Sequence, residues 1–190
     1  MANHCYNHIE FTGTSDRLNA LREGFVKLSK DSEYETFTEA CDKSFGLKSP
    51  PDADYSYYGT KWFEFEQGDV NSFLVVYGDS AWGPPEKLTQ ELCRAYHVSA
   101  RHEYEEPGCD FAGVTTFDEK GNYDQEQYTY WEFKYKHDQY HWWQEMIYLI
   151  KEEVYKNFDQ FAEHNGYADL EDLNEAWNEA HKQESKSNAQ

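Results

Sequence analysis

The alternation of apolar and polar residues predicts a strand at the start of the chain and a helix after it. Residues 4–12 alternate with a period of two, as expected of a strand with one buried face. In residues 16–29 the leucines and Phe25 recur at helical spacing, behind a Thr14-Ser15-Asp16 cap. No period persists over 32–58, which predicts a long loop with at most one short strand near Phe37.

The middle of the chain predicts a hairpin, a second helix and three more strands. The hairpin joins 62–66 to 72–77, and its second strand is apolar on both faces, which is typical of a central strand. Gly83-Pro84-Pro85 precedes an apolar stripe at helical spacing, so we expect a helix at about 84–96. The three further strands are expected at 98–104, 111–117 and 128–135.

This order predicts an α+β fold with a ferredoxin-like βαββαβ antiparallel sheet, extended by extra C-terminal strands. Right-handed crossovers would place both helices on one face of that sheet. We assign the ferredoxin-like domain to residues 1–136. Helical spacing continues beyond it and predicts a helical hairpin at 137–183, packed on the domain, with a flexible tail at 184–190.

The amino-acid composition excludes several classes of protein. The 190 residues carry a formal net charge of −20, so binding to nucleic acid or to an anionic membrane lacks an electrostatic driving force. Aromatic residues make up 18%, which argues against disorder. The N-terminus lacks a signal-peptide pattern and no apolar run is long enough to span a bilayer, so we expect a protein of the cytoplasm. Four widely spaced cysteines favour reduced, mostly buried thiols.

Four short sequence motifs, called the family strings below, resemble those of a known family. They are residues 3–7 (NHCYN), 58–62 (YGTKW), 80–85 (SAWGPP) and 106–113 (EPGCDFAG). In this order and spacing they resemble the YubB-type ferredoxin-like domain of phages and plasmids, over roughly residues 1–135. The resemblance implies the fold and a mobile-element origin, and it supplies no catalytic residues, because the family has no assigned activity. His4 stands where the family usually carries Trp.

The familiar enzyme signatures are absent, so the sequence favours a protein without catalytic residues, metal or cofactor. The alternative is a small-molecule, nucleotide-like site or a minor enzyme, with a pocket formed by Lys61, Trp62, Trp82 and Glu106 from the family strings. The competing interpretation, which we favour, is that the two tryptophans pack the core.

Three other groups of residues favour structural interpretations. His137 and His141 have an i, i+4 ligand spacing, but without a third ligand a solvated helix start is favoured. Glu103, Glu105, Glu106 and Asp110 could act as an acid and a base if burial raised one pKa, but they are expected to face water beside a Pro107-Gly108 turn. Cys5 or Cys109 would act as a nucleophile only with a histidine brought near by the fold.

The strongest functional signal is residues 121–148, where tyrosine, tryptophan and phenylalanine are interleaved with acidic residues. This composition is typical of an interface that meets a basic protein, although the same aromatic residues would also suit a core strand. The candidate partner-binding residues are Tyr123, Tyr128, Tyr130, Glu132, Tyr140, Trp142 and Glu145. The leading hypothesis is therefore a non-enzymatic phage or mobile-element protein that binds and occludes a basic host protein. A further alternative is that the domain only assembles with itself or with a virion component.

Overall fold

The computed structural model describes residues 3–30, 36–70 and 73–137, and the chain divides into two compact units, residues 1–130 and 131–190. The elements in chain order are β1 (His4–Thr12), α1 (Ser15–Lys30), α2 (Phe37–Phe45), β2 (Phe63–Val70), β3 (Phe73–Ala81), α3 (Glu86–Tyr96), β4 (Ser99–Glu106), the 3-10 helix η1 (Pro107–Cys109), β5 (Phe111–Phe117), β6 (Tyr123–Tyr128) and α4 (Tyr130–His137).

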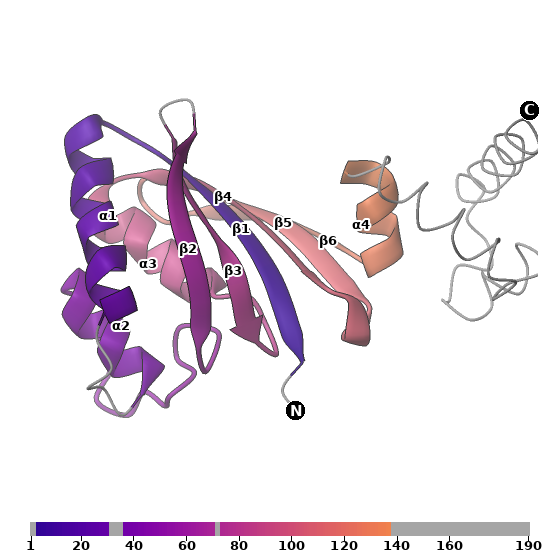
Figure 1. Ribbon diagram of the computed structural model, residues 1–190, viewed down its shortest axis with the longest axis horizontal. Coiled ribbons are helices and arrows are strands. Elements are labelled where there is room, and N and C mark those ends of the chain that lie inside the picture. Colours follow the sequence, from indigo (N-terminus) through magenta and orange to yellow (C-terminus); the bar gives the residue numbers. More distant parts are fainter. Residues whose placement is uncertain (1–2, 31–35, 71–72, 138–190) are drawn as a thin grey trace, which may run out of the picture. The chain divides into compact units, whose positions relative to one another are not determined.

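A six-stranded sheet organises the first unit (Figure 1). Its strands lie in the order β2-β3-β1-β4-β5-β6, and every neighbouring pair is antiparallel. The first four strands have the ferredoxin-like order, and β5 and β6 extend the sheet beyond β4, so the predicted fold class is confirmed. The prediction that the apolar strand β3 is central is also confirmed, because it lies between β2 and β1.

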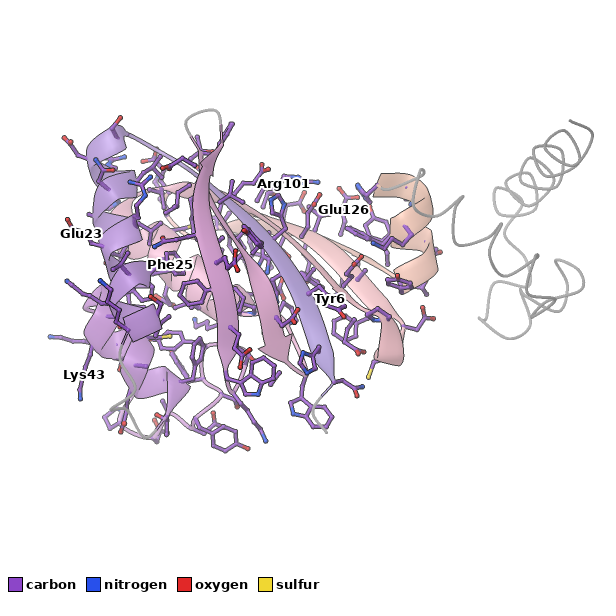
Figure 2. All side chains as sticks on the ribbon, in the orientation of Figure 1. Tyr6, Glu23, Phe25, Lys43, Arg101 and Glu126 are labelled. Atoms are coloured by element: carbon purple, nitrogen blue, oxygen red, sulfur yellow. The ribbon has the colours of Figure 1, made fainter. Side chains whose placement is uncertain are left out.

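The core lies between the sheet and helices α1, α2 and α3 (Figure 1). Phe25 of α1 is fully buried at its centre, with ring centroids 4.9 Å from Phe45 of α2 and 5.2 Å from Phe65 of β2. Figure 2 shows its ring between helix and sheet. From β1 the residues Cys5, Ile9 and Phe11 enter this core, as their alternation predicted.

The predicted loop over 32–58 was wrong where helix α2 forms. Thr36 caps the helix by accepting a hydrogen bond from the Glu39 amide at 3.2 Å, and Gly46 ends it with a left-handed φ of 68°. The buried positions Ala40, Cys41 and Phe45 lie on one face of a helix of nine residues. A pattern this short has only two turns in which to repeat, so the period is easily missed.

The predicted strand at 128–135 was also wrong. The sixth strand, β6, is the polar segment Tyr123–Tyr128, and the aromatic run after it forms helix α4 from Tyr130. Strand β2 is also longer than the predicted strand at 62–66, because it continues through Val70. The predicted helical hairpin at 137–183 and the tail at 184–190 lie outside the described residues, except for His137 at the end of α4.

Candidate functional site

The sheet has a second face, opposite the three helices, whose side chains remain at least partly exposed on most strands. Residues directly opposite each other on paired strands share a face, so the register defines it. We call this surface the open face. Its polar and aromatic side chains include His4, Tyr6, His8, Glu10, Glu64, Glu66, Tyr77, Asp79, Arg101, Glu103, Glu105, Asp124, Glu126 and Tyr128.

The charge on the open face is strongly one-sided. It carries eight carboxylates, whereas Arg101 is the single Lys or Arg in the six strands that the structure describes. Arg101 forms an ion pair with Glu103, its neighbour on β4. Same-face residues along a strand lie about 7 Å apart and adjacent strands about 4.8 Å apart, so the acids form a dense array.

Two histidines of β1 lie close to carboxylates of this array. His8 lies 3.8 Å from Glu103 and 3.9 Å from Glu10, and His4 lies 3.5 Å from Asp79. The His8 hydrogen bond, together with Arg101, lowers the pKa of Glu103 to about 2, and the same bond raises the pKa of His8. Glu103 therefore stays ionised, and protonation of His8 adjusts the charge at the centre of the face.

Two tyrosines stand out near the middle of the open face. Tyr6 is 48% exposed and Tyr77 is 46% exposed, both on central strands. The Tyr77 hydroxyl donates to Glu66 Oε2 at 2.8 Å, and this bond raises the pKa of Tyr77. In Figure 2 Tyr6, Arg101 and Glu126 extend from the sheet, whereas Glu23 and Lys43 extend from the helices. Half-exposed rings among acids supply contact area for a partner at low entropic cost.

The four family strings meet at one end of the sheet. The Trp82 amide donates to the Asn3 carbonyl at 3.0 Å, and the Asn3 side chain donates to Cys109 Sγ at 3.0 Å. Thr60 donates to the Ala81 carbonyl at 2.9 Å, and the ring centroids of His4 and Trp62 are 5.3 Å apart. The strings therefore form one structural unit that joins the ends of β1, β3 and β4 to the loop before β2.

Within this unit the four predicted pocket residues do not line one pocket. Lys61 and Trp62 line a groove of about 650 Å³ beside β2, together with apolar residues of α2 such as Phe37. The Lys61 ammonium lies 4.9 Å from the ring centroid of Tyr55 in this groove. Trp82 and Glu106 are not among the residues that line it.

The environments of Trp82 and Glu106 differ from those that the sequence predicted. Trp82 has a left-handed φ of 70° and is 52% exposed, so the interpretation of this ring as core was wrong. Glu106 is only 2% exposed, so the interpretation that it faces water was also wrong. Its Oε1 accepts the Gly108 amide at 3.2 Å, while its buried Oε2 has no hydrogen-bond partner among the described residues.

The two candidate nucleophiles are not activated thiols. Burial raises the pKa of Cys5 to about 12, and the neighbouring Glu106 side chain raises the pKa of the exposed Cys109. Because the thiolate is the reactive form, both cysteines are poor nucleophiles at neutral pH. Among the described residues no group of three or more His, Cys, Asp or Glu side chains is placed to hold a metal ion.

A buried polar network lies beneath the open face. Asn7 donates to the Cys5 carbonyl and to Ser80 Oγ, both at 2.8 Å, and its Oδ1 lies 3.0 Å from His102 Nε2. Since a carbonyl oxygen only accepts, His102 carries its proton on Nε2. Burial lowers the pKa of His102 to about 3, so it stays neutral and has a structural role.

The residues predicted to bind a partner are only partly described. Tyr123 is 62% exposed on the edge strand β6, and Tyr128 and Tyr130 are partly exposed. Glu132 lies in the first turn of α4, in the second unit. Tyr140, Trp142 and Glu145 lie outside the described residues.

Sequence reasoning grouped Glu103 and Glu105 only with the turn after them, and it missed the other acids and the tyrosines at the centre of the open face. Their signal was present in the alternation of Glu64 and Glu66 on β2 and of Arg101, Glu103 and Glu105 on β4. What the sequence could not show is that β2, β3, β1 and β4 are neighbours in this order, which collects these acids on one surface.

The structure defines the protein as an α+β domain with a ferredoxin-like antiparallel sheet and an acidic open face. In agreement with this fold, residues 54–147 match a family model described as the ferredoxin-like domain in Api92-like protein. The chain is also similar to the crystal structure of protein Api92 from Yersinia pseudotuberculosis, with 12% identity and a TM-score of 0.43, over 67% of this chain and 98% of that one. No curated protein matches the chain.

Among the helices in the described part of the chain, none has the length and apolar character needed to cross a membrane.

Proposed function

We propose that the protein binds a basic protein through the open face and has no catalytic role. The observation that carries this proposal is the set of eight carboxylates on one sheet face with a single, already paired, arginine. A surface of this sign attracts cationic partners and repels nucleic acid and anionic lipid.

Exposed aromatic rings turn this electrostatic attraction into a specific contact. Tyr6 and Tyr77 lie among the acids, and tyrosine is enriched among residues that dominate binding energy. The acids would steer a basic partner to the face, and the rings would bury against it once the two surfaces meet.

The proposed biological role is occlusion of a basic host protein in the cytoplasm by a phage or other mobile-element protein. The family strings support this origin through their resemblance to the YubB-type domain. A dense array of carboxylates resembles the phosphate charge of nucleic acid, so a partner that binds nucleic acid would present a complementary basic surface. Counter-defence is a role in which such occlusion is useful.

The test is affinity capture from a bacterial lysate followed by titration of the captured protein. We expect a basic protein to be captured at about 0.1 M salt and released at about 0.5 M, because the screening length shortens. The double variant Tyr6→Ala/Tyr77→Ala is expected to weaken binding of that protein at least about tenfold.

Tyr55→Ala is the matched control, because Tyr55 is 49% exposed but lies in the loop before β2. It should leave affinity unchanged. Equal loss in both variants, or capture that survives high salt, would contradict binding through the open face.

A further inference from the structure

A small pocket lies on the other side of the sheet, where β5 and β6 extend past the strands that the helices cover. It has a volume of about 180 Å³ and is formed between α3 and the two outer strands. The residues that matter for its chemistry are Glu86 and Lys87 of α3, Thr115 and Phe117 of β5, and Tyr123 and Gln125 of β6.

Glu86 is held in a fixed position in this pocket. Its Oε1 accepts hydrogen bonds from Gln125 Nε2 at 2.8 Å and from the buried Thr115 hydroxyl. Gln125 is itself oriented, since it also donates to the Tyr104 hydroxyl at 3.0 Å and accepts from Gln127 at 3.2 Å. Among the described residues both hydrogen bonds to the carboxylate end on Oε1, which leaves Oε2 for a ligand.

Among the residues that the structure describes, the carboxylate of Glu86 has no Lys, Arg or His in an ion pair with it. Lys87 also lines the pocket, but its ammonium lies 2.9 Å from Glu91 in an i, i+4 ion pair. Burial raises the pKa of Glu86, its two hydrogen bonds act in the opposite direction, and no nearby cation contributes. A half-buried, oriented carboxylate without a counter-ion favours a ligand that brings a positive charge and hydrogen-bond donors.

An exposed aromatic ring forms the outer wall. Tyr123 is 62% exposed, and its ring centroid lies 6.1 Å from that of the buried Phe117. A planar guanidinium can stack on such a ring while it donates to a carboxylate, whereas an ammonium acts as a point charge.

We propose that this pocket binds the guanidinium group of an arginine side chain from the basic partner. The inference rests on the proposed function and adds a specific contact to it. Tyr123 and Gln125 point to the pocket side of β6, and Asp124 and Glu126 lie on the open face of the same strand. A partner that covers this edge strand therefore reaches both the acidic face and the pocket.

The pocket can be tested without the partner, with N-acetyl-arginine amide as the probe and NMR titration of the full chain as the readout. We expect saturable shifts at Gln125 and Tyr123 with a Kd of about 1 mM, as befits a ligand of this size. The citrulline analogue, which is neutral but has nearly the same shape, should bind at least about tenfold more weakly. The lysine analogue should also bind more weakly.

Two variants assign the binding to Glu86. Glu86→Gln keeps an oxygen that accepts from Thr115 and Gln125, so the fold should persist while arginine binding is lost. Glu23→Gln, an exposed acid of α1, is the charge-matched control and should bind the probe as the parent does.

Several results would overturn the proposal. These are no saturable binding of the arginine probe, equal binding of the citrulline or lysine analogue, or unchanged binding in Glu86→Gln. Since no partner protein enters the experiment, a failure here leaves the open-face proposal standing. Failure of the capture experiment likewise leaves this test unaffected.

Discussion

At the scale of single residues, the network of Asn7 and His102 is the clearest determinant of stability. Asn7→Ala would leave His102 Nε2 and Ser80 Oγ each without one buried partner. We expect a loss of about 2–3 kcal/mol in the free energy of unfolding, measured by urea denaturation. Thr12→Ala, an exposed change on the same strand, should cost less than about 0.5 kcal/mol. Equal losses would show that the network contributes nothing specific.

The histidines give opposite pH dependences. The raised pKa of His8 means that its pairing with Glu103 stabilises the fold at low pH and is lost as pH rises through that raised pKa. The contribution of Glu103 is present above its unfolded pKa and fades only as pH falls toward about 2. His102, with a pKa of about 3, instead destabilises the fold as pH falls below the ordinary histidine range, because the unfolded state binds the proton.

NMR titration of the imidazole resonances measures these differences directly. We expect His8 to titrate above a model histidine and His102 to stay neutral down to the acid limit of the fold. In Glu103→Gln the pKa of His8 should fall toward that of a free histidine side chain, because its main partner is removed. An unchanged His8 titration in that variant would contradict the assigned ion pair.

At the scale of elements, the close approach of β2 and β3 depends on Gly78. A Cβ at this position would lie 2.0 Å from the Glu64 carbonyl oxygen and 2.7 Å from the Phe65 Cα. Backbone cannot move away as a side chain can, so Gly78→Ala should cost at least about 2 kcal/mol. Gly68→Ala on β2 is the matched control, since nothing lies within 4 Å of its Cβ position. Comparable thermal stabilities of the two variants would contradict this packing.

The elements also show what the sequence could predict and why the rest escaped it. Strand β1 and helices α1 and α3 were predicted because each buries one clear face against the core. Helix α2 carried a Thr36 cap and a Gly46 stop, but only two turns of apolar pattern. Strand β6 has a tyrosine at each end and only polar residues between, so it lacks the apolar alternation of a strand, although the Asp118–Asn122 turn connects it directly to β5. The alternating aromatic residues that follow Tyr130 predicted a strand, but they form the start of helix α4.

The chemical character of the candidate site could be predicted from the sequence, but its position on the fold could not. The acidic and aromatic character of the surface followed from composition, and Tyr123 and Tyr128 were named from the sequence. The acids of β2, β3, β1 and β4 form one face because β1 pairs with both β3 and β4, and β5 joins the acids of β6 to them. Thr115 and Gln125 face each other across the β5–β6 hairpin, but Glu86 lies 29 residues before Thr115, and no spacing rule would have joined it to them.

At the scale of the whole molecule, a formal charge of −20 by itself promotes solubility, so the central claim is about where the charge lies. If the open face binds a basic protein, charges on that face must matter more than equal charges elsewhere. Glu64 and Glu126 lie on the open face, whereas the exposed Glu23 and Glu39 lie on α1 and α2. The two pairs allow the same change in net charge to be placed on either side of the molecule.

The most direct measurement is the affinity of the captured basic protein for two charge-reversed variants, by titration calorimetry at about 0.1 M salt. We predict that Glu64→Lys/Glu126→Lys weakens binding at least about tenfold, while Glu23→Lys/Glu39→Lys changes it by less than about threefold. Equal weakening by the two variants would show that only net charge matters and would contradict binding through the open face.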